Sequence, residues 1–161
     1  MTPPAPPPAE PSARYTFVLK TRDRPGTLEL IAATFAHRGV SLSATVGCDA
    51  SFDPDGRASL TLHFCASERR KEALRQALLR LPRVLRVSEV AAASVQAVAL
   101  VRVAPDADLP AGDLAVFPLP RAGGDPSFRL IGSPEAVEAA IAAWRNAEKL
   151  RGVAYGVLAL D

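Results

Sequence analysis

The chain has 161 residues, of which 48% are hydrophobic and 22% are charged, a balance typical of a globular protein with one or two domains. Its 19 basic and 17 acidic residues give a formal net charge of +2, which excludes binding to nucleic acid or to an anionic membrane through net charge alone. No apolar stretch is long enough to span a membrane, and the N-terminus lacks the pattern of a signal peptide. We therefore expect a cytoplasmic protein.

Residues 1–13 contain the proline-dense run PPAPPPAEP. Because proline has no N–H donor, such a run favours polyproline II over helix or sheet. We expect a disordered tail, which is either solvated or a ligand for a proline-recognising partner.

Residues 14–90 carry strand and helix patterns in the order β-α-β-β-α-β. Apolar and polar residues alternate over 15–20, which predicts a first strand. A turn with the sequence RDRPGT follows, and then a helix that ends before Gly39, where a left-handed C-cap residue is expected. The apolar positions that fit one face of this helix are Leu28, Ile31, Ala32 and Phe35.

The rest of this segment predicts a hairpin, a second helix and a fourth strand. Alternation over 40–48 and 58–64 predicts two strands, and the DPDG sequence at 53–56 predicts the turn between them. Ser67 is a suitable N-cap for the second helix, and 84–90 form the last strand. Two helices on one face of an antiparallel sheet make a ferredoxin-like α+β domain. The apolar face of the second helix is Leu74, Ala77, Leu78 and Leu81.

Residues 95–161 repeat this order with one helix fewer. Strands are predicted over 95–103, at the proline-flanked segment 114–119, which suits a sheet edge, over 128–131 and over 153–160. The loop-like segment 104–113 stands where the first helix of the pattern would be. We expect a second ferredoxin-like domain that is trimmed of its first helix. Its remaining helix begins at Ser133-Pro134 and buries Val137, Ala140, Ile141 and Trp144.

Candidate catalytic and metal-binding groups are few. His37 and His63 have no metal-site motif around them, so we expect a surface histidine and a hydrogen-bonded strand histidine, respectively. Cys48 and Cys65 are expected to be reduced thiols, with a bridge between them as the alternative. The basic run at 69–71 is expected to be a solvated helix face. No nucleophile-elbow, Walker or dinucleotide motif occurs, and the strand RASLTLHF lacks the aromatic residues of an RNA-binding sheet.

The turn at 21–27, TRDRPGT, has properties that suit a small zwitterion. Free N–H groups at a helix start favour a carboxylate, Gly26 allows close approach of the backbone, and Asp23 can face an ammonium group. A plain strand-to-helix turn with an acidic cap explains the same residues. Both interpretations stay open from the letters alone.

The segment DRPGTL, followed by a helix and by RGVSL, resembles the ACT domain, an amino-acid-sensing ferredoxin-like module. Two further segments resemble the small regulatory subunit of acetolactate synthase (acetohydroxyacid synthase). One is LPRVLRVSEV, which is followed after a spacer by AVALVRV, and the other is the ending FRLIGSPEAVEAAIAAWRNAEKLRGVAYGVLAL. The resemblance covers residues 14–161, with an ACT domain at 14–90 and a second domain at 95–161.

The resemblance implies a non-catalytic subunit with no cofactor of its own. Such a subunit binds and activates a thiamine-diphosphate-dependent catalytic subunit and confers feedback inhibition by valine or another branched-chain amino acid. It also implies a homodimer in which ACT domains pair and hold the effector at their interface. A free-standing ACT-domain sensor with a different partner is the alternative. The implied effector-binding residues are Asp23, Arg24, Pro25, Gly26, Thr27, Leu28 and Ser41; the family usually has Asn at the first and the last of these positions.

Overall fold

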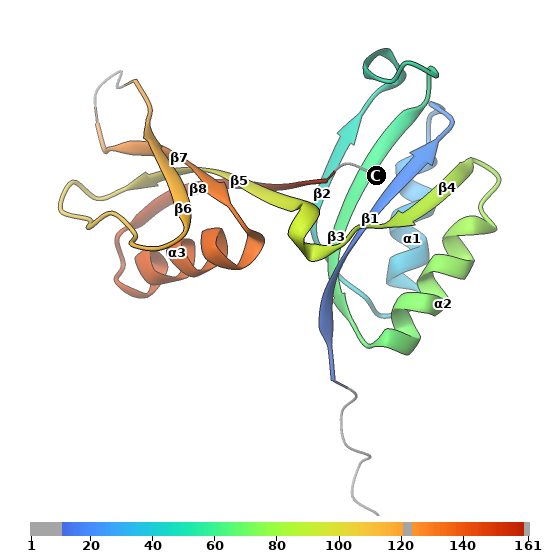
Figure 1. Cartoon of the computed structure of the whole chain (residues 1–161), viewed down its shortest axis with the longest axis horizontal. Coiled ribbons are helices and arrows are strands. Elements are labelled where there is room, and N and C mark those ends of the chain that lie inside the picture. Colours follow the sequence, from blue (N-terminus) through green and yellow to red (C-terminus); the bar gives the residue numbers. More distant parts are fainter. Residues whose placement is uncertain (1–10, 121–123, 160–161) are drawn as a thin grey trace, which may run out of the picture.

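The computed structural model describes residues 11–120 and 124–159, which form two α+β units side by side (Figure 1). The first ten residues of the expected tail, residues 121–123 and the last residue of the strand predicted over 153–160 lie outside the described residues. No helix in the described part of the chain is long and apolar enough to cross a bilayer.

The N-terminal unit consists of β1 (Ala13–Thr21), α1 (Thr27–Ala36), β2 (Leu42–Cys48), the 3-10 helix Ala50–Phe52, β3 (Ala58–Ala66), α2 (Glu68–Leu79) and β4 (Val84–Glu89). The C-terminal unit consists of β5 (Val95–Val103), β6 (Leu114–Pro118), β7 (Ser127–Gly132), α3 (Pro134–Asn146) and β8 (Leu150–Ala159).

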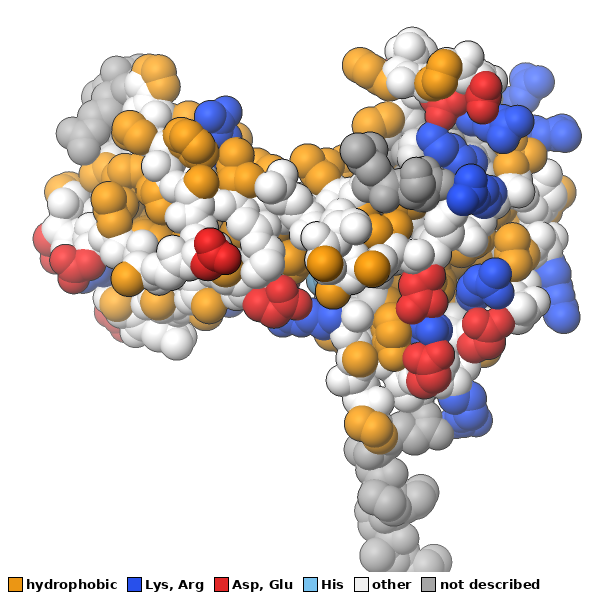
Figure 2. All heavy atoms as spheres, in the orientation of Figure 1, with side chains coloured by type: hydrophobic (Ala, Val, Ile, Leu, Met, Phe, Trp, Pro, Cys, Tyr) orange, Lys and Arg blue, Asp and Glu red, His pale blue; other side chains and the backbone are white. Residues whose placement is uncertain are grey.

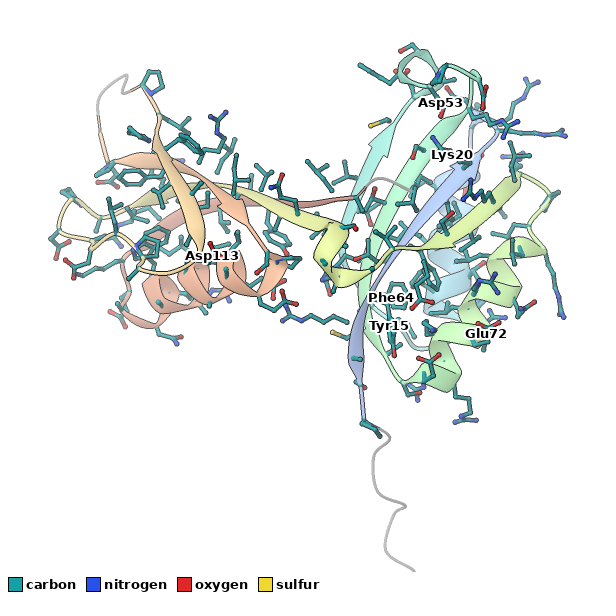
Figure 3. The ribbon with its side chains drawn as sticks, viewed as in Figure 1. Tyr15, Lys20, Asp53, Phe64, Glu72 and Asp113 are labelled. Atoms are coloured by element: carbon teal, nitrogen blue, oxygen red, sulfur yellow. The ribbon has the colours of Figure 1, made fainter. Side chains whose placement is uncertain are left out.

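The sheet of the N-terminal unit has the strand order β2-β3-β1-β4, and every neighbouring pair is antiparallel. Its two helices lie on one face, so the predicted ferredoxin-like order is confirmed (Figure 1). The core between sheet and helices centres on Phe64, whose ring meets those of Phe17 and Phe35 edge-on at centroid distances of 5.0 and 5.1 Å. Tyr15 lies beside Phe64 near the outer end of this core (Figure 3).

The buried face of α1 differs from the apolar pattern. Leu28 is 51% exposed and Ala32 is exposed, so the prediction that they are buried is wrong. Two threonines are buried instead, and the hydroxyl groups of Thr27 and Thr34 each donate a 2.8 Å hydrogen bond to a carbonyl of the preceding turn. Because these local bonds satisfy the hydroxyls, threonine can be buried without an unpaired polar group. The buried residues of α1 are Thr27, Ile31, Thr34 and Phe35.

The start of α2 contains a buried cation that the basic run does not predict. Lys71 is only 7% exposed, so the expectation of a solvated face is wrong for this residue. Its ammonium lies 2.6 Å from a Glu68 oxygen, 3.0 Å from a Glu89 oxygen and 5.0 Å from the centroid of the Tyr15 ring. Two carboxylates and an aromatic face therefore replace the water that this lysine loses.

Two predicted turns form as expected, but one strand is irregular. Gly39 and Gly56 have φ values of 62° and 65°, and the Gly56 N–H donates to the Asp53 carbonyl at 3.0 Å. The uninterrupted alternation expected along β2 is wrong, because its register against β3 shifts between Leu42 and Ala44. Leu42 packs against the helix-side core, whereas Ala44 lies on the opposite face of the sheet.

The sheet of the C-terminal unit has the order β6-β7-β5-β8, which repeats the topology of the first sheet. As predicted, 104–113 is a loop and β6 is an edge strand. This loop lies where the first helix of the pattern would be. It is held by two side chains: Trp144 Nε1 of α3 donates to the Asp108 carbonyl at 2.8 Å, and Lys149 Nζ, just after α3, donates to the Asp106 carbonyl at 2.7 Å. The last strand starts at Leu150, earlier than predicted.

The two units meet where β8 crosses β2 and β3 (Figure 1). An ion pair of 2.5 Å joins Arg14 of β1 to Glu138 of α3, and the Tyr155 hydroxyl donates to the same carboxylate at 2.8 Å. Beside this junction His63 is 4% exposed, and its Nδ1 lies 2.9 Å from Thr16 Oγ1. The expected hydrogen-bonded strand histidine is confirmed at 63, and His37 is exposed as expected.

His63 makes the stability of the fold depend on pH. Burial lowers the pKa of His63 below its ordinary value of 6.5; Arg14 adds to this effect, whereas Glu138 and Glu135 oppose it. The unfolded chain therefore binds a proton that the folded chain does not, so His63 has no effect above pH 6.5 and destabilises the fold as the pH falls below it.

We predict that the melting temperature falls more between about pH 7.5 and 5.5 in the wild type than in a His63→Gln variant. The exposed-site control His37→Gln should behave like the wild type, and an equal decline in the wild type and His63→Gln would contradict the prediction.

Candidate functional site

The turn between β1 and α1 is held by bonds to its own backbone and to the segment before β4. The Arg22 N–H donates to the Arg83 carbonyl at 2.9 Å, and the Arg83 guanidinium donates back to the Pro25 carbonyl. The Thr27 hydroxyl and N–H both donate to the Arg24 carbonyl, at 2.8 and 3.2 Å. These bonds fix the path of an otherwise exposed turn.

Gly26 is the residue at which the chain enters the helix. Its φ of 80° and ψ of 2° are left-handed, a conformation that glycine adopts without strain. A Cβ built here would lie 3.4 Å from Arg83 Nη1 and 3.9 Å from Glu29 Oε2, so the backbone is approached from two sides by charged groups. The turn conformation, more than space, requires glycine.

The first turn of α1 offers free backbone donors. Among the residues that the structure describes, no acceptor reaches the N–H groups of Leu28 and Glu29, whereas the Thr27 N–H is used by the turn. Such groups, at the positive end of the helix, bind carboxylates. The Glu29 side chain stands at the same helix end and complements this charge, so a bound anion would have to lie beside it.

Arg83 is the residue that the sequence patterns did not indicate. It lies just before β4, and antiparallel pairing of β4 with β1 brings it to the residues that follow β1. The strand order of a ferredoxin-like sheet would have predicted this neighbour. Its guanidinium is a second group at the turn that can hold a carboxylate.

The exposed groups around the turn are of mixed character. Asp23 and Glu29 carry negative charge, and Arg24 lies between them in the chain on the exposed surface. Leu28 and Leu30 are 51% and 39% exposed on the adjoining helix surface. Carboxylate, guanidinium and free N–H groups beside an apolar surface suit an amino acid with an aliphatic side chain.

The structure places six of the seven predicted site residues together and one apart. Asp23, Arg24, Pro25 and Gly26 form the turn, and Thr27 and Leu28 begin the helix. Ser41 is exposed just before β2, at the far end of α1, which is about 15 Å long for its 10 residues. The strand registers also place Ser41 far from the turn. Leu42, the next residue, pairs with Phe64, which pairs in turn with Tyr15 at the opposite end of β1 from the turn. A single copy of the chain therefore does not bring Ser41 to Gly26.

In the described part of the chain, the remaining histidine, cysteine and acidic residues do not form a second site. No cluster of three or more His, Cys, Asp or Glu residues that could hold a metal occurs within 11–120 and 124–159. Cys48 and Cys65 are both free and exposed, so the alternative of a bridge between them is excluded in this structure.

Comparison with known proteins supports the fold. No family model and no curated protein sequence matches the chain. Among solved structures, the acetolactate synthase small subunit from Thermotoga maritima matches with a TM-score of 0.72 and 16% identity, over 92% of this chain and 96% of that one. An unknown protein from Galdieria sulphuraria matches with a TM-score of 0.39 and 13% identity over 94% of this chain and 100% of that one, a score too low to indicate a shared fold. Because the identity is only 16%, the first match shows the fold alone, and its coverage means that both units share that fold.

The left-handed conformation of Gly26 leads to a stability prediction. A Gly26→Ala variant should lose about 1 kcal/mol of unfolding free energy, because alanine is strained at positive φ, and Gly26→Asn should lose less. Gly152→Ala is the matched control, since a Cβ there meets nothing closer than 3.6 Å and its φ is not positive. Urea unfolding would measure all three. A Gly26→Ala chain as stable as the wild type would contradict the assigned conformation.

Proposed function

We propose that this chain is a non-catalytic regulatory subunit of an acetolactate synthase. The observation that carries the proposal is the likeness to the Thermotoga maritima small subunit, which extends over 92% of the chain and includes both units. The sequence resemblance of the β1–α1 turn and of the C-terminal segment supports the same family. The first observation concerns backbone geometry, and the second concerns residue pattern.

The β1–α1 turn is the proposed effector site. The carboxylate of a branched-chain amino acid would bind the N–H groups of Leu28 and Glu29, with Arg83 beside them. Its ammonium would face Asp23, and its aliphatic side chain would lie on the exposed leucines of α1. Valine is the first candidate.

A homodimer is part of this proposal, because Ser41 lies at the far end of α1 from the turn. In a twofold dimer of the N-terminal units, Ser41 of one copy can meet the turn of the other, which would produce two equivalent sites. The exposure of the turn on the single chain supports a site that is completed by a second copy.

The first test is activation. The purified chain alone should show no turnover of pyruvate with thiamine diphosphate, and it should raise the activity of the acetolactate synthase catalytic subunit encoded by the same genome. Valine should then reduce the activity of the complex. If the chain binds valine but does not change the activity of that catalytic subunit, the free-standing sensor replaces the proposed function.

The second test is complementation between two defective sites. Asp23→Lys should abolish thermal stabilisation by valine, which for ligand at one hundred times its Kd amounts to about 2.7 kcal/mol. Asp55→Lys, a change at another exposed turn aspartate, is the matched control and should keep the effect. Ser41→Trp should also abolish it. A refolded mixture of Asp23→Lys and Ser41→Trp chains should recover binding, because a mixed dimer has one site with both residues intact. No recovery in a mixture that forms mixed dimers would contradict the shared site.

A further inference from the structure

The two faces of the C-terminal sheet differ in how far the rest of the chain covers them. One face is covered by α3 and by the loop 104–113. Of the residues that alternate onto the other face, Leu100 is 47% exposed and Phe117 is 41% exposed. We call this surface the open face. Its apolar members are Val98, Leu100, Ala115, Phe117, Ile131, Ala154 and Leu158.

The open face contrasts with the same face of the N-terminal sheet. There the central side chains are buried, with Thr16 at 3%, Thr61 at 8% and His63 at 4% exposure. The junction covers only one end of the open face, where Gly156 of β8 comes close to Val46 of β2. Figure 2 shows hydrophobic side chains over the surface of the C-terminal unit, away from this junction. An apolar sheet face that stays exposed is a common mark of a protein interface.

The charged residues on the strands of the open face all have one sign, and Asp125, just before β7, lines the same hollow of this face as Arg102. The charged residues that alternate onto it are Arg102 and Arg129, and the Arg129 guanidinium lies 4.9 Å above the Phe117 ring. Among the described residues, neither guanidinium has a carboxylate within ion-pair distance. An occupant that buries these groups must therefore supply acceptors, since an unpaired guanidinium is costly to remove from water.

This charge pattern selects between two kinds of occupant. A second copy stacked on the same face about a twofold axis would bring four guanidinium groups, two from each copy, into one interface, with only the Asp125 carboxylate of each copy as a counter-charge. A different protein with carboxylates beside apolar side chains would pair the two cations and cover the leucine and phenylalanine. The complement of the open face is thus an apolar patch with acidic neighbours.

We propose that the open face is the surface through which this chain binds a partner protein with an apolar, carboxylate-flanked patch. This inference rests on the proposed function, under which that partner is the catalytic subunit of acetolactate synthase. Leu100 and Phe117 would supply the buried apolar contact, and Arg102 and Arg129 would fix the orientation through bonds to carboxylates. The N-terminal unit stays available for pairing and for the effector.

The test measures binding of full-length variants to the catalytic subunit encoded by the same genome, by titration calorimetry. Leu100→Asp and the double variant Arg102→Glu/Arg129→Glu should each weaken binding by about tenfold or more. Arg145→Glu is the matched control, because Arg145 is exposed on α3, on the covered side of the same sheet, and it should bind as the wild type does. Melting curves check that each variant folds; if Leu100→Asp does not fold, the arginine variant carries the test, since it changes only exposed charged groups.

Salt dependence adds a second measurement. Binding of the wild type should weaken as salt is raised, and binding of an Arg102→Gln/Arg129→Gln variant should depend less on salt. If the folded open-face variants bind as tightly as the wild type, the inference is overturned while the proposed function stands. If the wild type does not bind the catalytic subunit, the proposed function fails, and the identity of the partner fails with it.

Discussion

Phe64 is the residue on which the geometry of the N-terminal unit depends. It lies on β3 and contacts aromatic rings from both other parts of the core, Phe17 on β1 and Phe35 on α1. This contact fixes the height and direction of α1 against the strand that precedes it. Because the β1–α1 turn has only a few residues, the position of its free N–H groups follows from how these rings meet. The candidate site is thus set by packing that lies well behind it.

The order of strands and helices follows from local pattern, and this part of the fold was predictable. The turns at Gly39 and Gly56, the N-caps at Ser67 and Ser133, and the missing helix at 104–113 all depend on neighbours in the chain. The error at Lys71 arose because contacts distant in sequence decide: Glu89 of β4 and Tyr15 of β1 pack against it, and no helical periodicity contains that information. On α1 the apolar pattern failed for a local reason, because Thr27 and Thr34 bond to carbonyls of the preceding turn and can be buried in place of Leu28 and Ala32.

The same distinction applies to the candidate site. The turn residues from Asp23 to Leu28 are contiguous, so their proximity was predictable from the sequence. Arg83 joins them only through the pairing of β1 with β4, and Ser41 is separated from them by the length of α1. A site that depends on pairing between strands, or between copies, requires the strand order before its members can be named. The assignment of the open face has the same requirement, because alternation shows which residues share a face but not which face is covered.

The loop that replaces a helix also sets how tightly different parts of the C-terminal unit are held. The amides of β5 are shielded between two neighbouring strands, β7 and β8, and open only when the sheet separates. The backbone of 104–113 lacks a ladder of helical bonds and is held mainly by Trp144 and Lys149. Local opening of this segment therefore costs much less free energy than opening of the sheet. Amide hydrogen exchange would divide the unit into a slow sheet and a fast loop, and proteases would find their first cleavage sites in that loop.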